Sequence, residues 1–154
     1  MMAEPNIGLL LYLPYRELET RIFDAVRAAG YDDMTLAQSR VFQRIAVDGS
    51  RLTDLAERAR VTKQTAGFLV DQLVKAGYVT RVVDPADARA RLIRVSERGS
   101  AAARFAAEVL AEVEAEWTAH LGERTMTQLR HALVKLREIT DADDRPVSGS
   151  APRR

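Results

Sequence analysis

Apolar residues recur every three or four positions along most of this chain, the spacing that places side chains on one face of an α-helix. Two shorter runs, residues 78–83 and 92–95, alternate apolar and polar positions and are rich in β-branched residues, which predicts β-strands. The charged stretch 84–91 between them contains the turn signal Asp-Pro and predicts a hairpin with a long basic tip. The helices predicted from the first pattern span residues 7–29, 36–47, 52–59, 62–76 and, as two helices broken at Gly122, 97–140.

Capping residues and glycines mark where these helices begin and end. Thr35 begins a capping box, because its hydroxyl can accept from the N–H three residues on while the Gln38 amide reaches back to the Thr35 N–H. Pro14 lies early in the first helix, where a proline either kinks the helix or begins its second half. The predicted N-caps are Thr35, Thr53, Thr62 and Ser96, and the predicted stops are Gly30, Gly77 and Gly122.

The order of the predicted elements indicates a winged helix. The helices over residues 52–59 and 62–76 are joined by Arg60 and Val61 alone, as in a helix-turn-helix, and the hairpin that follows supplies the wing. The fold class is therefore mainly α with a small β-hairpin wing, a winged helix-turn-helix over about residues 35–99. The positions predicted to be buried in the second helix of the pair are Ala66, Leu69, Val70 and Leu73.

Helices over about residues 7–29 and 97–140 flank the winged helix and carry apolar stripes that so small a module cannot cover alone. A second copy of the chain is the economical way to bury these stripes, which predicts a homodimer joined through the flanking helices. We expect one domain over residues 1–140 and a disordered tail over residues 141–154, because the tail has no large apolar residue beyond Val147. The residues predicted for dimer contacts are Leu10, Leu13, Leu18, Leu121, Leu129, Leu133 and Leu136.

The composition fits a single globular domain and excludes several classes of site. The chain has 154 residues, 47% of them hydrophobic and 29% charged, which is enough apolar material for one buried core. It has no cysteine, so disulfides, thiolate zinc sites and cysteine nucleophiles are excluded. The apolar stretch from Ile7 to Leu13 is shorter than the roughly 20 residues needed to cross a bilayer, and the chain does not open like a secretory signal, so a cytoplasmic protein is expected.

Positive charge is concentrated in the winged helix, although the whole chain carries only +1. Residues 51–99 contain ten basic and six acidic side chains, whereas residues 1–50 contain five and seven. Local positive charge is what a module that binds a polyanion needs, because neutralised phosphates release counterions; a merely solvated face is the alternative. Trp117 is expected in the core, and His120 and His131 without an acidic cluster predict no metal site. No catalytic loop or elbow motif is found in the sequence, so neither an enzyme nor a cofactor is expected.

Five short motifs, taken in their order and spacing, resemble the MarR family of transcriptional regulators. They are Leu52-Thr53-Asp54-Leu55-Ala56, Thr62-Lys63-Gln64-Thr65, Leu69-Val70-Asp71-Gln72-Leu73, Gly77-Tyr78-Val79 and Asp84-Pro85-Ala86-Asp87-Ala88-Arg89. The resemblance covers about residues 7–140. It implies a homodimer that binds a pseudo-palindromic operator in double-stranded DNA and is often released by a small, frequently aromatic, ligand. A ligand-responsive repressor is the first expectation, and activation is the open alternative.

The helix over residues 62–76 is predicted to be the recognition helix that enters the major groove. On the side opposite its buried residues, Gln64 can pair with an adenine edge, and Lys63 can take guanine or phosphate. Phe68 on this side is predicted either to touch a thymine methyl or to pack beneath the wing. Asp71 would repel phosphate and is predicted to orient a nearby arginine. The DNA-facing residues predicted in this helix are Thr62, Lys63, Gln64, Thr65, Gly67 and Phe68.

The hairpin tip, residues 84–91, is predicted to enter the minor groove. Asp87 and Arg89 match the Asp-x-Arg signature of the MarR family, and the resemblance implies that Asp87 holds the Arg89 guanidinium at narrow A·T-rich segments. The alternative is an exposed ion pair in a flexible loop. Ala88 stands where the family often has a second arginine, so one phosphate contact is expected to be missing. The further phosphate contacts predicted are Arg81, Arg91 and Arg94.

Two further hypotheses concern the partners of the chain. The resemblance implies a ligand cavity between the dimer helices and the winged helix, and we place it near Tyr12, Arg16 and Phe42. The alternative to DNA binding is a winged helix that serves as a protein-interaction scaffold, with Phe68 as an apolar anchor and without a specific operator.

Overall fold

The computed structural model describes residues 3–141, so the predicted tail lies outside the described residues except for Asp141. The described part is mainly helical and contains one antiparallel hairpin, β1–β2. This confirms the predicted fold class. The elements in chain order are α1 (Ile7–Ala28), α2 (Leu36–Phe42), α3 (Leu52–Ala59), α4 (Lys63–Lys75), β1 (Val79–Asp84), β2 (Asp87–Val95), α5 (Glu97–Leu121) and α6 (Glu123–Thr140).

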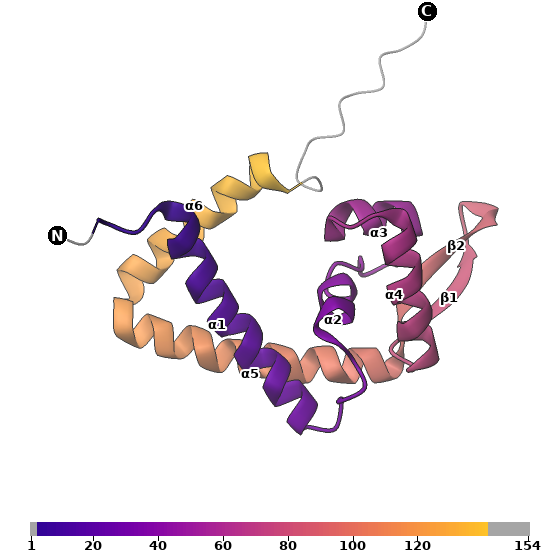
Figure 1. Cartoon of the computed structure of the whole chain (residues 1–154), viewed down its shortest axis with the longest axis horizontal. Coiled ribbons are helices and arrows are strands. Elements are labelled where there is room, and N and C mark those ends of the chain that lie inside the picture. Colours follow the sequence, from indigo (N-terminus) through magenta and orange to yellow (C-terminus); the bar gives the residue numbers. More distant parts are fainter. Residues whose placement is uncertain (1–2, 142–154) are drawn as a thin grey trace, which may run out of the picture.

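The elements form two regions that α5 connects (Figure 1). Helices α2, α3 and α4 pack together with the hairpin at one end of the molecule, and this group is the winged helix. The long helix α5 leads away from the hairpin, α1 packs across it, and α6 folds back from its far end. The flanking helices therefore lie beside the winged helix rather than around it, and much of their surface has no cover within one chain.

The hydrophobic core lies in the winged helix. Leu55, Val70, Leu73 and Tyr78 are fully buried, and Ile93 of β2 closes the core from the hairpin side. The four positions predicted to be buried in the recognition helix are all buried, which confirms the phase of that helix. They are Ala66, Leu69, Val70 and Leu73.

Three of the four predicted N-caps are confirmed. The Thr35 hydroxyl accepts from the Gln38 N–H at 3.2 Å while the Gln38 amide oxygen accepts from the Thr35 N–H at 3.0 Å, so the capping box is complete. Thr62 and Ser96 cap α4 and α5 by accepting N–H groups three residues on, each at 3.1 Å. The prediction for Thr53 is wrong: α3 begins at Leu52, and its N-cap is Arg51, which lies two residues before Thr53 and makes no side-chain cap bond.

Helix α2 ends at Phe42, five residues before the predicted end. The cause is a contact distant in sequence: the Ser50 backbone exchanges hydrogen bonds with the Ile93 backbone at 2.9 and 2.8 Å. The Ser50 hydroxyl also accepts from the Ala46 N–H at 2.9 Å. The chain therefore leaves the helix early and runs through turns to reach the hairpin, although its apolar spacing would allow α2 to continue.

The hairpin also differs from the prediction, because β2 begins at Asp87 and not at Leu92. The Asp84 carboxylate accepts from the Ala86 N–H at 2.8 Å, which closes a turn over Pro85 and Ala86. The pairing is regular from Val79 opposite Val95 as far as Val83, and it shifts before Asp84. The prediction of a long basic tip is therefore wrong, because residues 87–91 form part of β2 and only a short turn precedes them.

Helix α1 is continuous through Pro14, so this proline does not begin a separate helix. The helix starts after Asn6, whose side chain accepts from the Leu9 N–H at 3.0 Å. Within residues 3–141, no helix is long and apolar enough to span a membrane.

Candidate nucleic-acid interface

A tight turn between α3 and α4 sets the position of the recognition helix. Arg60 occupies the left-handed region at φ 56° and ψ 43°, and the Val61 N–H bonds back to the Ala56 carbonyl at 3.0 Å. Thr62 then caps α4. A Cβ at Gly67 would lie 3.5 Å from the Leu52 side chain, an ordinary van der Waals distance, so the packing of α4 on α3 does not require a glycine there.

The outward side of α4 presents a compact set of exposed side chains. Lys63, Gln64 and Thr65 are exposed at its N-terminal end, and Phe68 follows one turn later with 63% of its surface exposed. Gly67, which was predicted to face DNA, is instead half-buried and faces Leu52. The structure thus brings together all the predicted recognition-helix residues except Gly67, on a surface that nothing in the described chain covers.

Asp71 and Arg81 form an ion pair that joins α4 to β1. This is the arginine partner predicted for Asp71. The pair neutralises the one carboxylate on the outward side of α4. It also means that Arg81, predicted to contact phosphate, is already engaged with the recognition helix.

The wing places its arginines on β2. Arg89, Arg91 and Arg94 are all exposed. The Asp87 carboxylate accepts from the backbone N–H of Arg89 at 3.0 Å. Among the contacts found for residues 3–141, it has no bond to the Arg89 guanidinium, so the geometry differs from the one that the resemblance implied. The Asp87 side chain shapes the strand backbone and leaves the guanidinium to project on its own.

Sequence reasoning missed the ion pair that anchors the wing. Arg51, at the start of α3, donates to Asp84 from Nε at 2.8 Å and from Nη2 at 2.7 Å. The Ala86 N–H and then Arg51 lower the pKa of Asp84, because both favour the ionised carboxylate. The pair links two residues 33 positions apart in sequence, and no local motif marks it.

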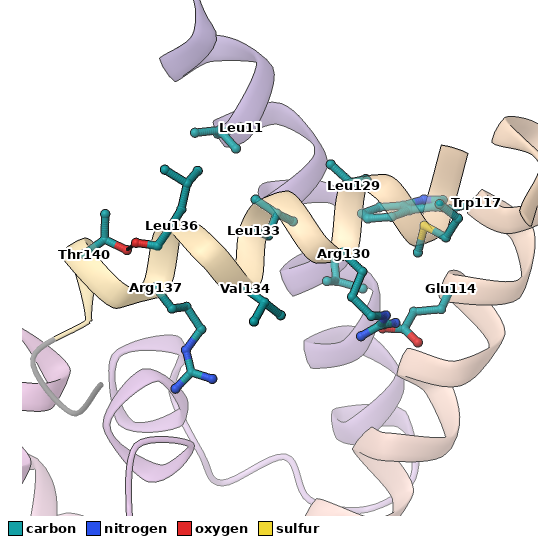
Figure 2. A pocket seen from close by; sticks show the side chains of 12 residues that line it. Leu11, Glu114, Trp117, Leu129, Arg130, Leu133, Val134, Leu136, Arg137 and Thr140 are labelled. Atoms are coloured by element: carbon teal, nitrogen blue, oxygen red, sulfur yellow. Dashed lines mark hydrogen bonds and ion pairs between the residues drawn. The ribbon is translucent and has the colours of Figure 1, made fainter. Parts of the chain in front are cut away.

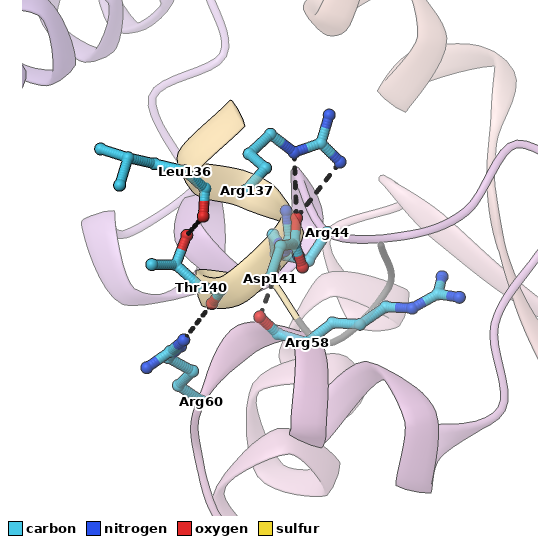
Figure 3. A network of polar contacts seen from close by, with 7 residues as sticks. All are labelled: Arg44, Arg58, Arg60, Leu136, Arg137, Thr140 and Asp141. Atoms are coloured by element: carbon cyan, nitrogen blue, oxygen red, sulfur yellow. Dashed lines mark hydrogen bonds and ion pairs between the residues drawn. The ribbon is translucent and has the colours of Figure 1, made fainter. Parts of the chain in front are cut away.

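The end of α6 contacts the helix-turn-helix through a second network that the sequence did not reveal (Figure 3). Arg60 donates to the Thr140 carbonyl at 2.5 Å. Arg44 donates to the Arg58 carbonyl at 3.2 Å and to the Asp141 carboxylate at 2.9 Å. A flanking helix is therefore attached at the turn that orients the recognition helix.

Exposed apolar side chains of α1 and α6 face two adjoining grooves of about 500 and 580 Å³. Leu129, Leu133 and Leu136 project from α6 towards Leu11 of α1, with Trp117 of α5 beside them (Figure 2). Trp117 is only half-buried here and lines both grooves, so it is not the core residue that was predicted. Of the residues predicted for dimer contacts, Leu18 is half-buried, and the exposed ones are Leu10, Leu13, Leu121, Leu129, Leu133 and Leu136.

The structure does not bring the three predicted ligand residues together. Phe42 lines a small apolar cavity of about 60 Å³ between α1, α2 and α5. Tyr12 lines one of the grooves instead. Arg16 donates to Glu19 at 2.5 Å. His120 and His131 are exposed, and no cluster of three or more His, Asp or Glu suited to a metal ion occurs within residues 3–141.

Comparisons with known proteins agree with one another. The MarR family pattern matches residues 32–90. The transcriptional activatory protein BadR of Rhodopseudomonas palustris is 30% identical over 130 residues, which cover 82% of this chain and 72% of BadR. The crystal structure of the transcriptional regulator Tm0710 from Thermotoga maritima is 25% identical, with a TM-score of 0.60 over 86% of this chain and 92% of that one. NadR in complex with 4-hydroxyphenylacetate is 22% identical and has the same fold, with a TM-score of 0.69 over 90% and 97%.

Proposed function

The chain belongs to the MarR family of transcriptional regulators, and on this premise we propose that it binds a pseudo-palindromic operator in double-stranded DNA as a homodimer. In this proposal α4 enters the major groove and the wing enters the minor groove. The observation that carries it is the position of the exposed residues at the start of α4, on the same winged helix as the exposed arginines of β2.

Each exposed group has a role that suits its chemistry. Gln64 reads an adenine edge with its amide, and Lys63 takes guanine or a phosphate. Thr62 and Thr65 lie where the helix dipole favours phosphate. Arg89 reaches the minor groove, where narrow A·T-rich segments concentrate negative potential, and Arg91 and Arg94 contact phosphate beside it.

The apolar grooves along α1 and α6 support the proposed dimer. Leucines exposed in rows on two helices are costly in water, and a second copy presents the same rows. The network at the end of α6 attaches this surface to the helix-turn-helix through Arg60. Dimer formation would therefore fix the spacing between the two recognition helices.

For regulation we propose a ligand-responsive repressor, in which a small aromatic compound enters between α1, α2 and α5 and weakens DNA binding. The complex of NadR with 4-hydroxyphenylacetate supports this class of ligand by analogy of fold. The present cavity of about 60 Å³ is smaller than the roughly 300 Å³ at which ligand pockets begin, so a ring enters only when these helices move apart. BadR is named an activatory protein, which makes activation the competing outcome.

The DNA-binding proposal is tested by the salt dependence of binding to duplex DNA. For a dimer that makes about 6–10 phosphate contacts, the affinity should fall by roughly 10³-fold or more between 50 and 200 mM salt. Arg89→Ala should weaken binding to all sequences and reduce the slope of log affinity against log salt by about 2, one contact per protomer. Gln64→Ala should change the preference at one base position in each half-site. The control is Arg104→Ala, which removes an exposed arginine of α5 outside the winged helix and should leave the affinity unchanged. An affinity that does not change with salt concentration would contradict the proposal.

A further inference from the structure

Phe68 is the one large apolar side chain on the outward side of α4, and 63% of its surface is exposed. The hairpin does not cover it, so the prediction that it packs beneath the wing is wrong. No ring stacking or cation contact involves Phe68 among residues 3–141. A single exposed ring does not by itself mark an interaction surface. The place of Phe68 gives its exposure a meaning, because it lies on the outward side of the proposed recognition helix, which a bound duplex would cover.

The neighbours of Phe68 define which partner fits. Gln64 lies one turn before it and the Asp71–Arg81 pair one turn after it, on the same side of the helix. That pair removes the negative charge that would repel a phosphate backbone. The exposed ring therefore stands in a polar strip in which the one carboxylate is paired with an arginine, and such a strip matches the edge of a DNA groove better than an apolar protein surface.

The major groove offers a single apolar group on its base edges, the 5-methyl of thymine. We propose that Phe68 contacts this methyl group, one or two base pairs from the adenine that Gln64 reads. The spacing follows from the helix, because one turn advances about 5.4 Å and base pairs are stacked about 3.4 Å apart. The inference rests on the proposed DNA binding. It adds a second recognised base, a thymine that is identified by contact with its methyl group and not by a hydrogen bond.

Deoxyuridine substitution tests this contact, since uracil differs from thymine only by the missing methyl. Each thymine of a selected operator is replaced in both half-sites, and the dissociation constant is measured for the intact dimer. Burying one methyl is worth about a threefold to fivefold change in affinity, so wild-type protein should bind roughly tenfold more weakly when the contacted thymine is replaced in both half-sites. Phe68→Ala should bind the thymine operator more weakly and should not distinguish thymine from uracil at that position.

Two further variants separate a base contact from a general loss of binding. Phe68→Leu keeps an apolar side chain and should keep part of the discrimination. Lys75→Ala changes an exposed residue on the same side of α4 and should keep all of it. The inference is overturned if wild-type protein binds thymine and uracil operators equally at every position, or if Phe68→Ala retains the discrimination. Failure of the folded wild-type dimer to bind any duplex would overturn the proposed function itself.

Discussion

Glu19 is the residue that joins α1 to α2. Arg40 donates to its carboxylate through two bonds of 2.8 Å, and Arg16 and the Tyr15 hydroxyl donate at 2.5 and 2.8 Å. The Arg40 bonds are the main reason that the pKa of Glu19 falls to about 2. Because the folded state favours the ionised form, this cluster stabilises the fold above about pH 4.5, and the stabilisation is lost as the pH falls towards 2.

Glu19→Gln should therefore lower the free energy of unfolding at pH 7 by about 1–2 kcal/mol, a value that allows for the solvent around Arg40. The difference from wild type should shrink as the pH falls from 4.5 towards 2, because Glu19 of the unfolded chain is protonated first and the folded carboxylate loses its charge only near pH 2. Urea unfolding at one protein concentration and several pH values measures this difference in the free energy of unfolding. Glu17→Gln, an exposed glutamate on the same helix, is the control, and an equal loss in the two variants would show that Glu19 has no special role.

Residues with local signals were predictable, and those with distant partners were not. The caps Thr35, Thr62 and Ser96 depend on groups three residues away, so sequence spacing finds them. Arg51 and Asp84 depend on how the hairpin folds back onto α3, which spacing does not encode. The exposure of Phe68 also needed the structure, because the same sequence fits a ring beneath the wing.

At the scale of elements, the apolar spacing predicted where the helices and strands lie but misplaced the end of one helix and the start of one strand. Helix α2 stops early because Ser50 pairs with Ile93, and that pairing spans more than forty residues. The wing strand starts early because Asp84 closes the turn at Ala86. In the first case a contact distant in sequence overrides the local apolar spacing, and in the second a short turn over Pro85 and Ala86 takes the place of a longer loop.

The anchoring of the wing gives a prediction at this scale. Asp84→Ala removes the bonds to Arg51 and to the Ala86 N–H, so the backbone amides of residues 86–91 should exchange with solvent faster than in wild type. Asp84→Asn keeps an oxygen that can accept from the Ala86 N–H but loses the charge that pairs with Arg51. Its amide exchange rates should lie between those of wild type and Asp84→Ala. Hydrogen exchange read by mass spectrometry or NMR measures this.

Asp87→Ala is the matched control for the wing, because Asp87 bonds only its own strand, at the Arg89 N–H, among the contacts found. Its effect should be confined to the amides next to Arg89. Equal exchange across residues 86–91 in wild type and Asp84→Ala would mean that Arg51 does not hold the wing.

The whole molecule carries its two surfaces on separate regions that α5 and the end of α6 connect (Figure 1). The apolar grooves lie between α1, α5 and α6 (Figure 2), and the exposed polar set lies on α4 and β2. The sequence predicted both surfaces, because each follows from the phase of a helix. It did not predict the Arg60–Thr140 contact between the two regions, since Thr140 lies at the edge of a tail with no pattern.

Leu133→Glu should weaken the proposed dimer, because it places a charge on the apolar surface of α6. We expect the dimer dissociation constant to rise at least about tenfold, and light scattering after gel filtration measures it. Val47→Glu makes the same kind of change at a residue that is 99% exposed in the turns after α2, and it should leave the dimer intact. An unchanged dimer in Leu133→Glu would place the interface elsewhere.

Selection of bound sequences from a random duplex pool examines both surfaces at once. Two recognition helices held by one dimer should enrich an inverted repeat whose half-site centres lie about 10 base pairs, or a multiple of this, apart on the duplex. Enrichment of an unpaired half-site, or of no sequence at all, would contradict a dimer that reads its operator with α4 and the wing.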